Sequence, residues 1–131
     1  MSYDIVAFDP GATTDSGFLD WYNTQTEWAE DHDYCDVTVT TPELRAFYTA
    51  ITEVFPPLNG PDAPDDEQLA ADSSLDGRLT DYSIGTTIIY ASFGWSQAER
   101  ATETFRELAA EHKVAVALVS HDSPVPIIRP Q

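Results

Sequence analysis

Two apolar stripes at helical spacing most constrain the fold of this chain, because each must be buried against another element. The first helix should start at Thr41-Pro42-Glu43, which combines an N-cap side chain, a proline at the first helical position and an acid beside the positive helix end. It should end before Pro56-Pro57. The second stripe covers about residues 97–112, and Ser96 with Glu99 predicts a capping box at its start. We therefore expect two helices that pack on one sheet.

Four segments with strand character would form that sheet. Residues Tyr3 to Phe8 are followed by the turn signal Asp9-Pro10-Gly11, and residues 82–84 and 86–93 are rich in β-branched and aromatic side chains. Residues 114–119 are continuously apolar, which is typical of a strand buried on both faces. The order of elements predicts an α+β fold with a single four-stranded, mainly antiparallel sheet and helices on one face (split βαβ, ferredoxin-like). The other face would be wet or covered by a partner.

The remaining segments have weaker signals. We expect a helix over roughly residues 16–30 and an edge strand or extended loop over 34–40. Residues 56–79 form an acidic, proline-rich segment that predicts a long surface loop with one helical turn near Glu67 to Ala71. Residues 123–131 predict a proline-rich surface tail. The length of 131 residues suits one domain over residues 1–131.

Charge gives the strongest functional signal. The chain has 23 acidic and six basic residues, a net charge of −17, and its first 44 residues contain ten acids but no lysine or arginine. Aromatic residues are interleaved with these acids. A surface of one sign steers an oppositely charged partner, and aromatic side chains anchor interfaces. We therefore predict a basic protein partner and no nucleic acid or membrane partner. The candidate contact residues are Asp20, Trp21, Glu27, Trp28, Glu30, Asp31, Asp33, Tyr34, Asp65 and Asp66.

No residue pattern predicts catalysis, a metal site or a cofactor. His32-x-x-Cys35 lacks the second pair of ligands that a structural zinc site needs. Ser120-His121-Asp122 places adjacent side chains on opposite faces of a strand end, so they cannot form a nucleophile–base relay. No glycine-rich nucleotide motif is present. We expect a protein that is not an enzyme.

The sequence also predicts a cytoplasmic location. Its N-terminal segment has no basic region, and no stretch approaches the ~20 apolar residues of a membrane span. The single cysteine, Cys35, fits a reducing compartment.

Several short blocks resemble a group of small acidic bacterial proteins. These blocks are Met1-Ser2-Tyr3-Asp4, Thr41-Pro42-Glu43-Leu44-x-x-Phe47-Tyr48, Ile89-Tyr90-x-x-Phe93-x-Trp95-Ser96-x-Ala98-Glu99 and Leu108-Ala109-x-Glu111-His112. They are similar to proteins that begin "MSYD", carry a "WSxAE" step into the last helix and include immunity proteins of polymorphic toxin systems. The resemblance implies an immunity function but assigns no functional residue.

Together these features lead to two hypotheses, with an enzyme as a third. The first is an immunity or inhibitor protein that binds a basic toxin domain, such as a nuclease or another nucleotide-directed enzyme, and occludes its active site. The alternative is a non-enzymatic acidic scaffold or regulatory domain whose charge is an adaptation to high salt. The partner's identity and the oligomeric state are open at this stage.

Overall fold

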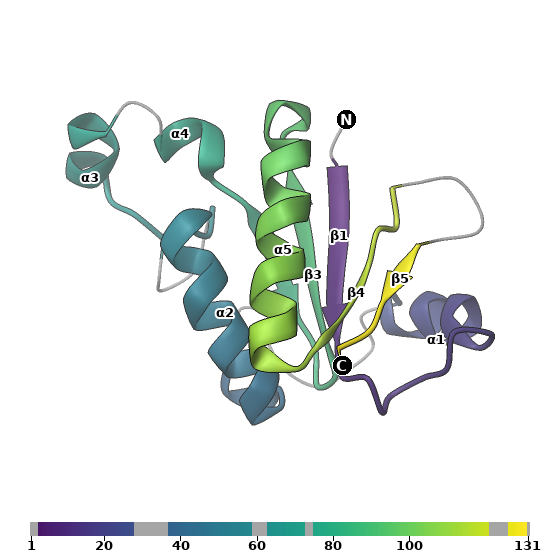
Figure 1. Ribbon diagram of the computed structural model, residues 1–131. Coiled ribbons are helices and arrows are strands. Elements are labelled where there is room, and N and C mark those ends of the chain that lie inside the picture. Colours follow the sequence, from purple (N-terminus) through teal and green to yellow (C-terminus); the bar gives the residue numbers. More distant parts are fainter. Residues whose placement is uncertain (1–2, 28–36, 59–62, 73–74, 121–125, 131) are drawn as a thin grey trace.

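The chain forms an α+β structure around one antiparallel sheet (Figure 1). The computed structural model describes residues 3–27, 37–58, 63–72, 75–120 and 126–130. The sheet has five strands in the order β2-β3-β1-β4-β5, and each neighbouring pair is antiparallel. The strands are β1 (Tyr3–Phe8), β2 (Asp81–Ile84), β3 (Ile88–Phe93), β4 (Ala115–Ala117) and β5 (Ile127–Ile128).

Helices α2 and α5 lie side by side on one face of the sheet, which we call the helix face (Figure 1). Phe105 of α5 packs between Phe47 of α2, at a ring distance of 5.0 Å, and Phe93 of β3, at 5.6 Å. This confirms the two helices expected from the apolar stripes. The helices and 3-10 turns are α1 (Phe18–Gln25), η1 (Val37–Val39), α2 (Pro42–Val54), α3 (Asp66–Ala71), α4 (Leu75–Arg78), η2 (Trp95–Gln97) and α5 (Ala98–His112).

The two predicted helix starts have different outcomes. The Thr41 hydroxyl accepts a hydrogen bond from the Leu44 amide at 3.2 Å, so the predicted N-cap of α2 is confirmed. The predicted capping box at Ser96 is wrong, because Ser96 lies inside η2 and α5 starts two residues later. A capping box does form at the start of α3, where Asp65 and Gln68 bond to each other's backbone amides.

The opposite face of the sheet, which we call the open face, is partly covered by α1. Val6 and Phe8 of β1 and Ile88 of β3 are buried there with Phe18 of α1. The prediction that helices cover only one face is therefore wrong. The central strands are apolar on both sides near the end of β1, so that end of the sheet needs cover on both faces.

The prediction of four strands is also wrong, because the proline-rich tail adds β5 to the sheet. Ile127 and Ile128 pair with β4, and the Leu118 amide donates to the Pro126 carbonyl at 3.0 Å. Pro126 and Pro130 flank the new strand. Proline cannot donate to a strand ladder, so the edge strand stays short and offers little template for further pairing.

Other boundaries differ from the prediction. The helix expected over 16–30 starts at Phe18 and ends at Gln25, and its last predicted residues lie outside the described part of the chain. Of the edge strand or extended loop expected over 34–40, residues 34–36 lie outside the described part of the chain, and residues 37–39 form a 3-10 turn. In the segment 56–79, α3 confirms the helical turn expected near Glu67 to Ala71, whereas α4 and the bridge between Pro57 and Thr80 were not expected.

Arg129, just after β5, fastens the segment that leads into α1. Its guanidinium donates to an Asp15 carboxylate oxygen at 2.5 Å and to the carbonyls of Pro10 and Thr13, both at 2.8 Å. The same group lies 5.8 Å from the ring centre of Phe8. Arg129 thus holds the segment before α1 against the sheet.

Candidate functional site

The open face changes from apolar to polar along β1. Strand side chains alternate between faces, so Asp4, Val6 and Phe8 share the open face. At the polar end, Asp4 pairs with Ser92, which in turn pairs with Asp81. Two carboxylates therefore flank one hydroxyl across three neighbouring strands.

Helix α1 covers the apolar end with aromatic side chains. Phe18 is buried, and Trp21 packs at 5.3 Å from Phe8 and 5.8 Å from Phe18 between ring centres. Tyr22 is stacked on Phe18 at 5.5 Å and on Tyr90 at 6.4 Å. These rings attach α1 to the sheet, and Tyr22 stands at the border between the covered and polar ends.

A pocket of about 230 Å³ lies at this border. We call it the open-face pocket; it is lined by Tyr22, Thr26, Asp81, Ser83, Tyr90 and Ser92. Within the described residues, no hydrogen bond or ion pair occupies the side chains of Asp81, Ser83 or Ser92. Asp81 is exposed and the two serines are half-buried. The pocket therefore offers one carboxylate and two hydroxyls to a ligand.

The tyrosines of the pocket are held in the neutral form. Burial raises the pKa of Tyr90, and its hydrogen bond to Asp4, with an oxygen–oxygen distance of 2.5 Å, raises it further. Burial also raises the pKa of Tyr22; the Tyr90 hydroxyl lowers that pKa in part, and the charge of Asp4 adds to the rise. Both side chains are thus phenols at neutral pH, and Asp81 is the charged group that lines the pocket.

None of the six basic residues of the chain lines the open-face pocket, and all six are among the described residues. Most of them belong to the helix-face layer or to α4, and Arg129 is engaged by the segment before α1. No cation of the chain therefore lines the pocket beside Asp81, and Arg129 lies at the other end of the open face, over Phe8. The six are Arg45 on α2, Arg78 on α4, Arg100 and Arg106 on α5, Lys113 directly after α5, and Arg129.

The structure separates the contact residues expected from sequence. Asp20 and Glu27 are exposed on or just after α1, whereas Trp21 is half-buried against Phe8 and Phe18. Asp65 and Asp66 belong to the start of α3, on the other side of the molecule from α1 (Figure 1). The remaining predicted contacts lie outside the described residues: Trp28, Glu30, Asp31, Asp33 and Tyr34.

Sequence analysis missed the polar residues of the open face itself. Asp4, Asp81, Ser83 and Ser92 alternate with buried residues along their strands. That alternation was a usable signal for a solvated sheet face. Their common location depends on the pairing register of β1, β2 and β3, which no local pattern reveals.

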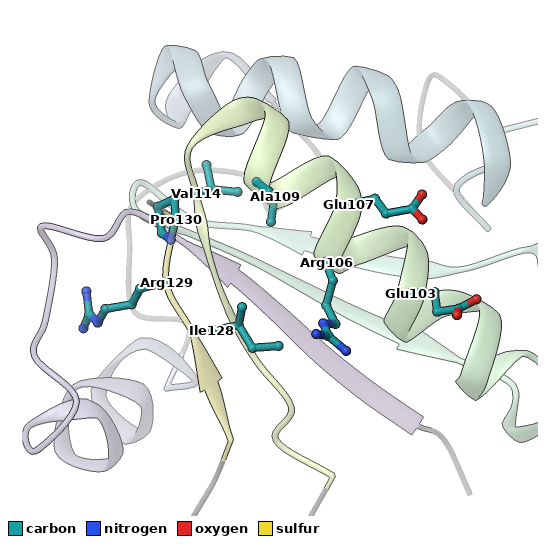
Figure 2. Close-up of a pocket in the computed structure, with 9 residues that line it drawn as sticks. Glu103, Arg106, Glu107, Ala109, Val114, Ile128, Arg129 and Pro130 are labelled. Atoms are coloured by element: carbon teal, nitrogen blue, oxygen red, sulfur yellow. The ribbon is translucent and has the colours of Figure 1, made fainter.

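A second, larger cavity of about 530 Å³ lies between α5 and the β5 edge (Figure 2). Val114, Ile128 and Ala109 give it an apolar floor, while Arg106 and Glu103 contribute opposite charges. Figure 2 shows Arg129 pointing away from the other lining side chains. This groove has neither a single sign of charge nor a converging set of polar groups, so it defines no ligand chemistry.

No three histidine, cysteine, aspartate or glutamate side chains among the described residues are close enough to hold a metal ion. Over the same residues, every helix is too short or too polar to cross a membrane.

Fold and pocket together define an α+β protein with a polar sheet face of negative charge. A scan against protein-family models and searches of the curated proteins and the solved structures found no match. The resemblance to immunity proteins, which rests on short blocks of sequence, therefore stays a prediction.

Proposed function

We propose that this chain is a cytoplasmic immunity or inhibitor protein that binds a basic toxin domain, such as a nuclease or another nucleotide-directed enzyme. The observation that carries the proposal is the acidic polar end of the open face, where no basic residue lines the pocket. Asp4 and Asp81 lie at the polar end of the open face, and none of the six basic residues lines the pocket there; Arg129 lies over Phe8 at the end that α1 covers and is paired with Asp15. Complementary charge of this kind selects partners and speeds their association.

The contact surface would extend from the open-face pocket onto α1. Asp20 and Glu27 are exposed there, and Leu19 has 51% of its surface exposed beside them. Carboxylates around an apolar side chain resemble the charged rim and apolar centre of protein interfaces. In a nuclease, these carboxylates would occupy positions that the substrate phosphates otherwise take.

A ferredoxin-like, split βαβ arrangement of the first four strands is also a proposal. It is supported by the order of the strands, in which β3 lies between β1 and β2 and β1 lies between β3 and β4.

A second candidate function, an acidic scaffold adapted to high salt, is favoured by one observation. Glu99, Glu103, Glu107 and Glu111 are all exposed and follow each other at four-residue spacing on α5. Like charges at this spacing destabilise a helix at low salt, and salt screens that repulsion. Acid is therefore not confined to the open face.

Affinity capture followed by charge reversal distinguishes the two functions. We expect the tagged protein to retain one basic enzyme domain at low salt, and the purified complex to lack that enzyme's activity. Asp81→Lys should weaken the complex at least tenfold, mainly at low salt, because a repulsive charge replaces an attractive one. Glu53→Lys on α2 is the matched control, since it makes the same charge change at an exposed site on the helix-face layer.

Equal weakening by both substitutions would show that only net charge matters and would favour the scaffold hypothesis. Capture of no basic domain would contradict the inhibitor proposal.

A further inference from the structure

We propose that the open-face pocket receives one arginine side chain of the basic partner. This inference rests on the proposed function, because it specifies the chemistry of that same surface. It assigns a binding role to Asp81, Ser83 and Ser92, which the sequence alone did not single out.

The hydrogen-bonding groups of the pocket suit a guanidinium. Asp81 lies opposite Ser92, and Ser83 is two residues along on the same face of β2. Side chains directly opposite in an antiparallel pair have Cβ atoms about 4.5–5.5 Å apart. Arginine carries five N–H donors in a planar fork, so it can donate to a carboxylate and to neighbouring hydroxyls at once. A lysine ammonium concentrates its donors at one point.

The charge of the pocket excludes anionic ligands. Tyr90 donates its hydrogen to Asp4, and no arginine or lysine of the chain lines the pocket. A phosphate or carboxylate would therefore meet Asp81 without a compensating cation. A cation gains from Asp81 directly and from Asp4 nearby on the same face.

The size of the pocket indicates a side chain. Its volume of about 230 Å³ is smaller than the roughly 300–1,000 Å³ of typical small-molecule sites. Tyr22 and Tyr90 form an aromatic wall that can contact the aliphatic stem of an arginine while the head group reaches Asp81. The occupant we infer is thus a single arginine presented by a protein surface.

The test uses the isolated full-length chain and a small probe, N-acetyl-arginine methylamide, followed by NMR chemical shifts. We expect saturable shifts of the Ser83, Tyr90 and Ser92 amides, with weak affinity because one side chain makes few contacts. The neutral isostere N-acetyl-citrulline methylamide should give much smaller shifts. Asp81→Asn should weaken arginine binding about tenfold or more, since hydrogen bonds to a charged acceptor are the strong ones. Glu53→Gln, at an exposed site on α2, should leave the binding unchanged.

Equal shifts with arginine and citrulline, or shifts centred on α3, would overturn the assignment. The probe also separates this inference from the proposed function. If the arginine probe binds but no basic protein partner is captured, the assignment of the pocket stands and the inhibitor proposal fails. If a basic toxin domain is captured and Asp81→Asn does not weaken its binding, the inhibitor proposal stands and the assignment of the pocket fails.

Discussion

The two faces of the sheet differ in how completely they are covered. On the helix face, α2 and α5 bury a continuous cluster that extends from Tyr3 to Leu118 along the chain. On the open face, α1 buries only the end of β1, and the polar end holds Asp4, Asp81 and the pocket. One sheet therefore combines a face that stabilises the fold with a face that can meet a partner. Substitutions on the two faces should have separable effects.

The charged residues are also distributed differently on the two faces. The helix-face layer mixes Glu99, Glu103 and Glu107 with Arg100 and Arg106 on a single helix. Repulsion and attraction partly cancel there, and exposed pairs of this kind contribute little to stability. On the open face the pocket has no basic residue, so its field is not cancelled locally. The proposed interface is centred on a pocket whose one charged lining residue, Asp81, is acidic.

The largest expected effect tests the division of stability between the faces. Phe105→Ala, in the fully buried centre of the helix face, should lower the free energy of unfolding by about 3–5 kcal/mol. Trp21→Ala, on the open face, should cost less, about 2 kcal/mol, because Trp21 is only half-buried. Chemical denaturation of both variants at one pH measures the difference.

Binding of the basic partner gives the reverse ranking for these two sites. Phe105→Ala should leave affinity unchanged under conditions where the variant is folded, whereas Trp21→Ala loosens α1 beside the pocket and should weaken it. Similar costs in stability for both variants would mean that the open face is as important to the fold as the helix face.

Arg129 tests whether the chain terminus holds the open face in shape. Arg129→Ala removes three hydrogen bonds and the contact with Phe8, so we expect a loss of about 2 kcal/mol. Arg129→Lys should recover only part of it, because an ammonium cannot reproduce the planar fork. Asp15→Asn serves as the control: its carboxylate is 64% exposed, so breaking that ion pair alone should cost about 0–1 kcal/mol. If Asp15→Asn lowers the free energy of unfolding as much as Arg129→Ala does, the stabilisation by Arg129 comes from its ion pair with Asp15 and not from the other contacts.

Local signals predicted the helix face well. Thr41 and Pro42 mark the start of α2 because an N-cap acts over three residues, and the apolar stripes of α2 and α5 face one cluster as expected. The Ser96 signal failed because η2 takes up that residue, and local sequence does not decide between a 3-10 turn and a helix start. β5 was missed because two isoleucines between prolines resemble a loop until β4 offers an edge.

The sequence predicted the acidity of the candidate site but not the residues that come together in it. An excess of acid and a wet sheet face were expected, but Asp4 and Asp81 are far apart in the chain and meet only through their pairings with Ser92. Trp21 was expected to contact a partner, yet it packs against Phe8, as an aromatic residue on an amphipathic helix does when an apolar strand lies beneath it. Register decides these locations, and register depends on the whole fold.

The smallest expected effect compares two phenols, one on each face: Tyr82, which is buried, and Tyr90, which is half-buried. Tyr82, on the helix face, donates to the Phe55 carbonyl at 2.7 Å, and Tyr90, on the open face, donates to Asp4. At pH 8, Tyr82→Phe should cost about 1–2 kcal/mol because a buried carbonyl loses a donor, and Tyr90→Phe about 1 kcal/mol because water can reach its acceptor.

The pKa of each phenol is raised, chiefly by burial, while an unfolded tyrosine ionises near its usual value of about 10. The stabilisation is therefore complete below pH 10 and is lost as the pH rises above it. Urea unfolding between pH 8 and 11 should show wild-type stability falling above pH 10, and each Tyr→Phe variant falling less steeply. A slope in Tyr90→Phe identical to that of the wild type would mean that the pKa of Tyr90 is the same in the folded chain as in the unfolded one.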